Sequence, residues 1–509
     1  MGAELEDGER RRFMLCVSIG RGRHKHVIAE HRHLAETGAQ LVEWRLDYIN
    51  GQVNIGRLLD NRPCPAIATV RRQRDGGKWI GGEDMRLLLL RTAIAQGVDY
   101  VDLEEDVASS VPRFGKTKRI VSLHDFSKTP DDLEAVHARL AAMDADIVKI
   151  ATMANNPHDN VRMLQLVQRS LVPTVGICMG DMGTPSRVLA GKFGAPFTYS
   201  TFHPERALAP GLISFKEMQE LYRFDSINTE TEVLGVIADP VGHSMSPLIH
   251  NGALGEQGLN KVYLPFRVPR ADLKQFITED CPALGVRGLS VTIPHKETVM
   301  EFCQHVDPAV QGIGAANTLV CDGGHWTAYN TDYRAAMDSL EGAFGADGRK
   351  AMAGKSALIL GTGGVARAIA YGLARRQVKL LLAARTRERG EKLAQLVKGQ
   401  VIDWDMRHSV KPDILVNCTP VGMHPNVDET PFDRRYLRRT MVVFDTVYNP
   451  ERTMLVKDAR EQQATVVTGL EMFIRQAAHQ YKLFTQHDPA IKVMRDALRR
   501  AIGPAKYES

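Results

Sequence analysis

Eight short runs of β-branched and apolar residues recur between residues 13 and 202, and they constrain the fold of this chain more than any other feature. Helix-length segments separate the runs, as parallel strands require, because every parallel pair needs a crossover connection. Eight such units predict a (β/α)8 barrel, which at roughly 25 residues per unit is compact for that fold. The runs are FMLCVSI, LVEWRLD, AIATVR, YVDLEED, RIVSLHD, IVKIAT, TVGICM and FTYSTF.

Charged side chains interrupt these apolar runs. Glu43 and Arg45 lie two residues apart and therefore share one face of their strand. Arg71, His124 and Lys149 lie at or near the C-terminal ends of theirs, where barrel active sites are built. Because both neighbours of Lys149 are apolar, its own side chain is expected to point to the opposite, interior face. The pattern predicts a polar site inside the barrel mouth.

A buried lysine beside a histidine indicates covalent chemistry on a ketone. The lysine attacks only as the free amine, and burial with nearby guanidinium groups is expected to favour that neutral form. Condensation gives an iminium that acidifies the adjacent C–H bond. No metal is needed for this chemistry.

The second half of the chain is predicted to form separate domains, because 509 residues exceed what one hydrophobic core can organise. The helix LISFKEMQELYRF is expected to close the barrel near Phe224, and the polar DSINTETE to link the halves. From Val233 strands and helices alternate in a βα pattern. In LILGTGGVARAIA an apolar strand runs into a glycine-rich turn and a helix, which is typical of a dinucleotide-binding domain.

The cofactor is predicted to be NADP. The turn glycines Gly361, Gly363 and Gly364 would let a pyrophosphate approach the helix N-terminus. The next strand, KLLLAAR, ends where an NAD enzyme would carry Asp or Glu for the ribose hydroxyls. Two cations and a hydroxyl, which suit a 2′-phosphate, stand there instead: Arg385, Thr386 and Arg389. The alternative is that Arg385 only caps a strand at the surface.

The motifs ADPVGHSMSPLIH, LSVTIPHKE, GAANTL, YNTDY and LGTGG resemble the shikimate dehydrogenase family, and the resemblance covers Val233 to Pro504. It implies that Lys296 and Asp332 form the catalytic pair, a lysine held by an aspartate that gives a proton to the developing alkoxide. For Lys296 and Asp332 the alternative is a surface ion pair. The resemblance implies substrate contacts from Ser244, Ser246, Thr292, Asn317, Tyr448 and Gln476, and cofactor contacts that include Thr446 and Gly469.

The first half resembles type I 3-dehydroquinate dehydratase from Phe13 to Phe224, and the two halves together resemble the plant-type bifunctional fusion. The resemblance implies that Lys149 is the Schiff-base lysine and His124 the general acid and base. It also implies substrate contacts from Glu43, Arg45 and Arg71, and a carboxylate clamp from Arg187 in GTPSR.

Five positions depart from the patterns of these families. In the barrel, Asp75 stands where the dehydratases usually have Glu, and Leu208 and Leu212 replace the polar ends of S-A-P-G-Q. Each lost polar contact costs about 1 to 3 kcal/mol in a dry site, which predicts a working but weaker dehydratase. The alternative is a non-catalytic ligand-binding module beside an active dehydrogenase of shikimate or quinate. In the second half, Ala384 and Ser290 stand where Asn is frequent.

The overall prediction is an α/β protein with a barrel at 11–224, a substrate-binding domain at 232–335 completed by helices at 470–504, and a Rossmann-type NADP domain at 336–469. Its expected ligands are 3-dehydroquinate, 3-dehydroshikimate, shikimate and NADP, while the oligomeric state is left open. Charge of +5 spread along the chain gives no reason to expect nucleic acid. Absence of an apolar leader, of 18 consecutive apolar residues and of C-x-x-C pairs predicts a cytoplasmic protein with reduced thiols. A metal on the cluster His24, His26, His31 and His33 is not expected, for want of ligand spacing.

Overall fold

The computed structural model describes residues 13–60, 62–242 and 244–502. The predicted outer limits at 11 and 504 lie outside the described residues. The described chain divides into two compact units. One holds residues 13–233, 240–242 and 260–285, and the other holds 234–239, 244–259 and 286–502.

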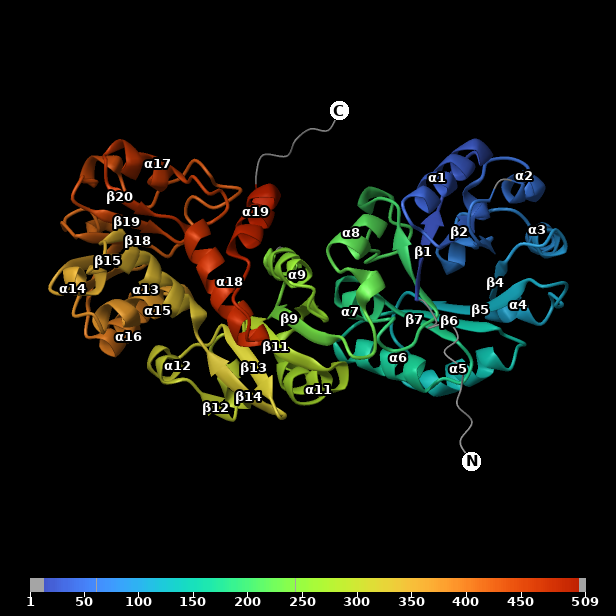
Figure 1. The fold of residues 1–509 in the computed structure, drawn as a ribbon, viewed down its shortest axis with the longest axis horizontal. Coiled ribbons are helices and arrows are strands. Elements are labelled where there is room, and N and C mark those ends of the chain that lie inside the picture. The colour runs from blue at the N-terminus through green and yellow to red at the C-terminus, as the bar shows by residue number, and fades with distance from the viewer. Residues whose placement is uncertain (1–12, 61, 243, 503–509) are drawn as a thin grey trace. The chain divides into compact units, whose positions relative to one another are not determined.

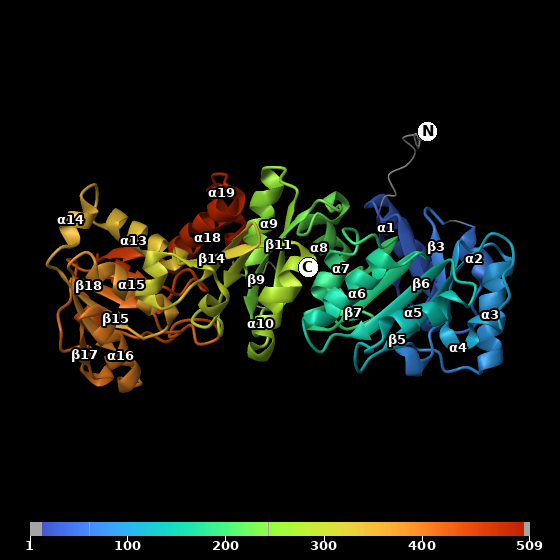
Figure 2. The same ribbon diagram turned by 90° about the horizontal axis from the view of Figure 1, so that it is seen from below.

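The predicted barrel is confirmed as a ring of eight parallel strands that is nearly closed, in the order β7-β6-β5-β4-β3-β2-β1-β8. The helices that connect the strands lie outside the ring (Figures 1 and 2). The strands are β1 (Met14–Ile19), β2 (Leu41–Arg45), β3 (Ala66–Thr69), β4 (Tyr100–Glu104), β5 (Lys118–Asp125), β6 (Ile147–Met153), β7 (Thr174–Met179) and β8 (Phe197–Thr201). The helices are α1 (His24–Glu36), α2 (Ile55–Leu59), α3 (Glu83–Ala95), α4 (Glu105–Ala108), α5 (Leu133–Ala141), α6 (His158–Arg169), α7 (Thr184–Val188) and α8 (Phe215–Glu220).

The interior of the barrel is layered along the strands. Apolar side chains from the early strand positions, among them Cys16, Leu41 and Phe197, form one buried cluster. Side chains on one face recur with a period of two, and two residues further along β2, β4 and β6 the same face carries Glu43, Asp102 and Lys149. The apolar layers therefore fill the barrel beneath a polar mouth.

A six-stranded mixed sheet has the order β10-β9-β11-β13-β14-β12, and β13 pairs antiparallel with both β11 and β14. Its strands are β9 (Glu232–Ala238), β10 (Lys261–Arg267), β11 (Val286–Val291), β12 (His305–Val306), β13 (Thr318–Asp322) and β14 (His325–Tyr329). Helices in this stretch are α9 (Ser246–Glu256), α10 (Leu273–Gln275), α11 (Cys281–Leu284), α12 (Pro308–Ile313), α13 (Thr331–Ala343) and α14 (Gly348–Met352).

The predicted Rossmann-type sheet is confirmed as six parallel strands in the order β17-β16-β15-β18-β19-β20. Numbered from β15, this is the order 3-2-1-4-5-6, which places the switch point between β15 and β18, where dinucleotides bind. The strands are β15 (Ser356–Leu360), β16 (Lys379–Ala383), β17 (Gln400–Ile402), β18 (Ile414–Asn417), β19 (Val442–Asp445) and β20 (Thr465–Val467). The helices are α15 (Gly364–Ala374), α16 (Arg387–Val397), α17 (Met454–Glu461), α18 (Gly469–Thr485) and α19 (Ile491–Ile502).

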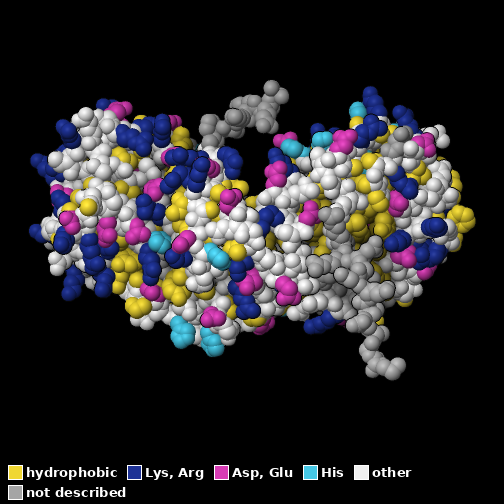
Figure 3. Space-filling view, viewed as in Figure 1, with side chains coloured by type: hydrophobic (Ala, Val, Ile, Leu, Met, Phe, Trp, Pro, Cys, Tyr) yellow, Lys and Arg dark blue, Asp and Glu magenta, His cyan; other side chains and the backbone are white. Residues whose placement is uncertain are grey.

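The described surface carries charges of both signs (Figure 3), and the cysteines are unpaired. Figure 3 shows Lys and Arg side chains interspersed with Asp and Glu rather than gathered in one stripe on the displayed face. Within the described ranges, no helix is long and apolar enough to cross a bilayer. All seven cysteines are free thiols.

The histidines of α1 have separate surroundings. His31 is buried, and its Nδ1 accepts a hydrogen bond of 3.2 Å from the Trp44 indole. The Nε2 of His31 lies 3.2 Å from the Cys64 sulfur. His24 instead accepts a bond of 2.8 Å from the Asn54 amide, and His26 is exposed. Among the described residues, no group of three or more His, Cys, Asp or Glu could hold a metal ion.

Burial of His31 has a consequence for stability against pH. Burial lowers the pKa of His31 to about 4, whereas an unfolded histidine titrates near 6.5. Between these values the unfolded chain binds a proton that the folded chain does not, so stability falls as the pH falls. We expect about 2 kcal/mol of the free energy of unfolding to be lost between pH 7 and 5 through His31. Urea unfolding at pH 7 and at pH 5, followed by tryptophan fluorescence, measures this difference in the free energy of unfolding.

In that experiment His31→Gln should remove about 2 kcal/mol of the pH-dependent difference, because glutamine does not titrate. His26→Gln, an exposed change on the same helix, is the control and should keep the wild-type difference. Equal losses in His31→Gln and the wild type between the two pH values would contradict the assignment.

Candidate active sites

A cavity of about 70 Å³ opens at the C-terminal ends of the barrel strands. Its lining includes every barrel residue that the sequence predicts for the site, namely Glu43, Arg45, Arg71, His124, Lys149 and Arg187. The three barrel departures, Asp75, Leu208 and Leu212, line the same cavity. The six expected residues and the three altered ones therefore face one space.

The amine of Lys149 lies among carboxylates and one aromatic ring. Its Nζ donates to the Asp102 Oδ2 at 3.0 Å, and the Glu43 Oε1 lies 3.9 Å away. The centre of the Tyr199 ring lies 4.1 Å from the same nitrogen. The structure thus differs from the expectation of surrounding guanidinium groups, because the charges nearest to the Lys149 nitrogen are the carboxylates of Asp102 and Glu43. Sequence reasoning missed both Asp102 and Tyr199.

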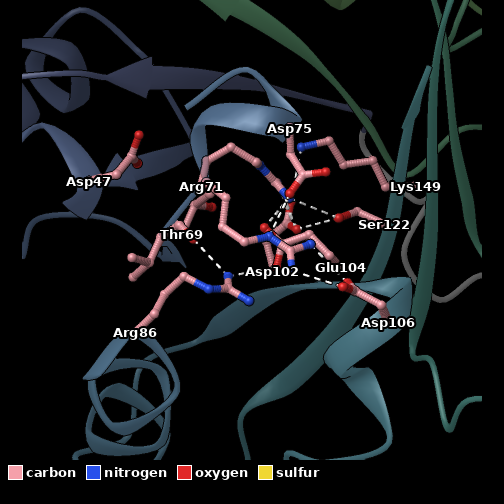
Figure 4. A network of polar contacts seen from close by, with 12 residues as sticks. Asp47, Thr69, Arg71, Asp75, Arg86, Asp102, Glu104, Asp106, Ser122 and Lys149 are labelled. Atoms are coloured by element: carbon pink, nitrogen blue, oxygen red, sulfur yellow. Dashed lines mark hydrogen bonds and ion pairs between the residues drawn. The ribbon is translucent and has the colours of Figure 1, made fainter. Parts of the chain in front are cut away.

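A chain of alternating charges runs from Lys149 to helix α3 (Figure 4). Beyond Asp102, the Arg71 guanidinium contacts the Asp102 Oδ1 and the Glu104 Oε1, each at 2.8 Å. The second oxygen of Glu104 accepts a bond of 2.7 Å from Arg86, which is fully buried. Although burial alone would raise it, the charges of Arg71 and Lys149 hold the pKa of Asp102 well below its usual range. Asp102 is therefore a carboxylate at any physiological pH.

Two further carboxylates hold the opposite wall of the cavity in place. Glu43 accepts from the Ser18 hydroxyl at 2.6 Å and from the Thr69 hydroxyl at 2.9 Å. Arg45 forms two hydrogen bonds, of 3.0 and 2.8 Å, with Asp47. Both oxygens of Glu43 are thereby fixed by neighbouring strands, so its carboxylate is rigidly oriented.

His124 is poised to accept a proton. Its ring stacks on that of Phe126, with 6.3 Å between centres and 17° between planes. Burial, and then the positive charges of Arg71 and Lys149, lower the pKa of His124 well below its ordinary value. The imidazole is consequently neutral near pH 7. Ser122 of β5 pairs with Lys149 of β6. His124 lies two residues beyond Ser122 on β5, so the His124 and Lys149 side chains both lie on the interior face of the barrel.

Arg187 is a buried cation with spare hydrogen-bonding capacity. It donates to the Pro210 carbonyl at 3.2 Å, while its Nε has no partner among the described residues. Burial lowers the pKa of Arg187 to about 10. An unsatisfied guanidinium N–H at a cavity wall suits a ligand carboxylate. Asp75, which lines the same cavity, accepts a hydrogen bond of 2.6 Å from the Arg72 Nε.

In the second unit, Lys296 and Asp332 form the predicted pair. The Lys296 Nζ donates to the Asp332 Oδ2 at 2.6 Å. Lys296 follows β11, and Asp332 lies in the first turn of α13. The Lys296 carbonyl accepts from the Ala316 amide at 2.7 Å, which ties its loop to the residues before β13. The pair is partly shielded from water, with side chains 17% and 9% exposed, so it is more than a solvated surface contact.

Asn317 belongs to a buried hydrogen-bond network that fixes its amide. Its Oδ1 accepts from the Thr331 backbone amide at 2.8 Å, and its Nδ2 donates to the Thr331 hydroxyl at 3.0 Å. Gln480 on α18 donates to the Asn317 carbonyl at 3.0 Å and accepts from the Ser290 hydroxyl at 2.9 Å. Ser290, one of the departures, is thus part of this network. Sequence reasoning missed Gln480, which lies one helical turn beyond Gln476.

The remaining predicted substrate residues occupy the ends of neighbouring elements. Ser246 begins α9, and its amide donates to the Ser244 hydroxyl at 3.3 Å. The Thr292 amide donates to the end of β9, at the Ile237 carbonyl, with a length of 3.2 Å. The last two are tied to α18 or lie on it: Tyr448 stacks on Phe473 of α18 with ring centres 4.5 Å apart, and Gln476 lies one turn later on that helix.

The glycine turn fits a dinucleotide. Gly361 has φ +102°, and a Cβ there would lie 3.0 Å from the Cys418 carbonyl, so only glycine suits the switch point. Gly363 caps α15, whose first residue is Gly364. A Cβ on Gly364 would lie 3.3 Å from the Lys296 side chain, which places the lysine beside the turn. Gly469 also lies close to a neighbouring backbone, because a Cβ there would lie 2.2 Å from the carbonyl of Val447, the residue after Thr446.

The cations predicted for the 2′-phosphate are available. Arg385, Thr386 and Arg389 follow β16 and are exposed. Neither Arg385 nor Arg389 forms an ion pair within the part of the chain that the structure describes. Arg387, between them, is instead engaged by Glu391 and Asp403, each at 2.9 Å. The residues present therefore fit a phosphorylated dinucleotide.

Comparisons with known proteins match both halves. The family model described as type I 3-dehydroquinase matches residues 15–229. The shikimate dehydrogenase substrate binding domain matches 236–319, and the shikimate 5′-dehydrogenase C-terminal domain matches 469–499. The three matches follow one another along the chain, and the last covers most of the two helices α18 and α19.

Individual relatives cover either the whole chain or its second half. The bifunctional 3-dehydroquinate dehydratase/shikimate dehydrogenase of Arabidopsis thaliana, named as chloroplastic, is 36% identical over 93% of this chain and 82% of its own length. The shikimate dehydrogenase (NADP(+)) of Methanocaldococcus jannaschii is 39% identical over 53% of this chain and 98% of its own. A crystal structure of a shikimate dehydrogenase in complex with NADP+ is 38% identical, covers 55% of this chain and 98% of its own, and superposes with a TM-score of 0.51.

The phosphate site yields a prediction about cofactor choice. Arg385→Gln with Arg389→Gln should lower kcat/KM for NADPH about tenfold or more, because hydrogen bonds to a charged group contribute about 1.5 to 3 kcal/mol. The value for NADH, which lacks the phosphate, should change little. Arg387→Gln is the matched control, because that guanidinium is held by acids. Initial rates with both cofactors decide, and an unchanged NADPH/NADH ratio in the double variant would refute the site.

Proposed function

The chain belongs to the family of bifunctional 3-dehydroquinate dehydratase/shikimate dehydrogenase, and we propose that the residues described above carry its two reactions. It is an enzyme of the shikimate pathway with a lyase half and an NADP-dependent oxidoreductase half. The first half dehydrates 3-dehydroquinate to 3-dehydroshikimate, and the second reduces that product to shikimate.

In the barrel, Arg187 and Arg71 would hold the substrate, and Lys149 would attack its ketone. The Lys149 nitrogen forms a bond to the carbonyl carbon, and the carbonyl oxygen leaves as water. Neutral His124 then takes the proton from the carbon beside the iminium, and protonates the hydroxyl that leaves as a second water. Hydrolysis of the iminium consumes one water and releases 3-dehydroshikimate with the lysine restored.

In the second half, Lys296 would donate the proton and Asp332 would hold it in position. NADPH, when bound, supplies the hydride. As the ketone oxygen gains negative charge, the Lys296 Nζ gives it a proton and also stabilises the charge before transfer. Asn317, with its amide fixed by Thr331, presents a rigid contact to the substrate. Because Lys296 lies close to the turn at Gly364, the proton donor and the cofactor site are adjacent.

The altered mouth of the barrel supports a dehydratase of reduced efficiency. Leu208 and Leu212 line the cavity, so substrate hydroxyls there meet methyl groups. Each missing partner costs about 1 to 3 kcal/mol in a dry site. A module that only binds would not need a lysine and a neutral histidine facing one cavity, and we therefore favour catalysis over mere binding.

The domain limits given from the sequence, a barrel to 224, a substrate domain at 232–335 with the helices from 470, and an NADP domain at 336–469, form part of the proposal. Their support is the separation of the chain into three sheets. All the proposed ligands are small molecules, and neither half is proposed to bind nucleic acid or a membrane. Free thiols support a reducing compartment, for which we propose the cytoplasm.

One observation carries the dehydratase proposal: Lys149 and a neutral His124 line the same cavity. Borohydride added with 3-dehydroquinate should therefore reduce an adduct onto Lys149, visible by mass spectrometry. In a coupled assay that starts from 3-dehydroquinate with NADPH, Lys149→Ala should abolish turnover but leave reduction of 3-dehydroshikimate intact. Lys296→Ala should slow both about 10²- to 10⁴-fold, because the general acid is lost.

Lys118→Ala is the matched control, since Lys118 is an exposed lysine at the other end of the neighbouring strand β5. It should behave as the wild type in both assays. An adduct on another lysine, or normal dehydration by Lys149→Ala, would refute the assignment.

A further inference from the structure

The ring of Tyr199 faces the nitrogen at which the barrel chemistry takes place. Tyr199 lies on β8, is buried, and lines the cavity together with Lys149. Its ring centre is 4.1 Å from the Lys149 Nζ, well within the range in which an aromatic face attracts a cation. The Tyr199 hydroxyl has no hydrogen-bond partner among the described residues. The ring therefore makes the contact with Lys149, and the phenol oxygen is left out of it.

Condensation places a positive charge on the Lys149 nitrogen that the attacking amine does not carry. A neutral amine has two N–H bonds. When it condenses with a ketone, one of these hydrogens moves to the carbonyl oxygen, and the proton that a lysine releases in becoming an amine joins it there. The oxygen leaves as water, and the iminium nitrogen keeps one hydrogen and the positive charge. No oxidant or reductant takes part.

Carboxylates and the ring respond differently to that change. Asp102 and Glu43 lie 3.0 and 3.9 Å from the nitrogen and can accept from its N–H groups. With one N–H left, the iminium can donate to only one of them at a time. An aromatic face attracts positive charge regardless of the number of N–H bonds. The ring therefore attracts the cationic intermediate more strongly than the neutral amine, while the single N–H of the iminium leaves only one carboxylate as its partner.

We propose that Tyr199 is a catalytic residue whose aromatic face stabilises the iminium cation formed on Lys149. The inference rests on the Schiff-base role proposed for Lys149. Burial, and then the negative charge of Glu43, raise the pKa of Tyr199 well above its ordinary value, so the phenol stays neutral and adds no competing anion. The role belongs to the ring and not to the hydroxyl.

Three variants separate the ring from its surroundings. Tyr199→Phe keeps the aromatic face and removes the hydroxyl, whereas Tyr199→Leu removes the face. Phe197→Leu is the matched control: Phe197 is two residues earlier on β8, is buried in the same apolar cluster, and packs edge-on against Tyr199 at 5.6 Å between ring centres. Phe197→Leu removes an aromatic ring from the same core but keeps the Tyr199 ring next to Lys149.

The readouts are the fraction of chains with a reduced adduct on Lys149 after borohydride at a fixed 3-dehydroquinate concentration, and kcat/KM for dehydration. Tyr199→Leu should lower both about tenfold, the middle of the range for a desolvated cation–π contact. Tyr199→Phe and Phe197→Leu should stay within about twofold of the wild type. Reduction of 3-dehydroshikimate by the same chains should be unchanged and serves as the internal reference.

Fluorinated phenylalanines placed at position 199 keep the proposal testable if Tyr199→Leu does not fold. Each added fluorine weakens the negative face of the ring with little change of shape, so trapping should decline stepwise with fluorine number. Equal trapping across that series overturns the proposal, as does an equal loss in Tyr199→Phe or in Phe197→Leu. A wild-type chain without any adduct on Lys149 overturns the Schiff-base role itself, whereas a normal wild-type adduct with a flat series overturns only the role of the ring.

Discussion

The barrel site depends on one chain of alternating charges that is buried from Arg86 inward. From helix α3 inward, Glu83, Arg86, Glu104, Arg71 and Asp102 lead to Lys149, and each contact is between opposite charges. Removing such groups from water is costly, and the cost is offset only where every charge has opposite partners and further hydrogen bonds. Arg86 meets this condition with four donations, one of them to the Val70 carbonyl next to Arg71. A helix outside the ring thereby fixes the position of a guanidinium inside it.

The alternating pattern also limits what any one position can become. Loss of a middle member leaves its neighbour as an uncompensated buried charge, which typically destabilises by about 3 to 5 kcal/mol. The two carboxylates of β4 are the most constrained, because Asp102 and Glu104 each accept from two different side chains. Two of the three departures in the barrel, Leu208 and Leu212, are instead apolar residues of the cavity wall, and neither leaves a buried charge behind.

Much of this could be predicted from the sequence, because strand alternation is local. Charges two apart in an apolar run share a face, and this rule located Glu43 and Arg45. The same rule applies to YVDLEED, in which Asp102 and Glu104 stand two apart, so the signal for both was present. No such signal marks Arg86: a helical arginine is usually solvated, and only the strand packed against α3 makes it buried. Likewise Gln480 and Phe473 act through helix α18 on segments more than 150 and about 25 residues away, contacts that no local spacing encodes.

The two lysines show how surroundings, and not residue type, assign the chemistry. Each is held by an aspartate, at 3.0 Å for Lys149 and 2.6 Å for Lys296. In the proposed reduction Lys296 donates a proton, so a single carboxylate that orients it is sufficient. In the proposed dehydration Lys149 loses N–H bonds as it forms a covalent bond, and its surroundings include a neutral histidine in the same cavity and an aromatic face. A neutral base to receive a proton and a surface that tolerates the resulting cation are what a lysine nucleophile needs, and the barrel supplies them around Lys149.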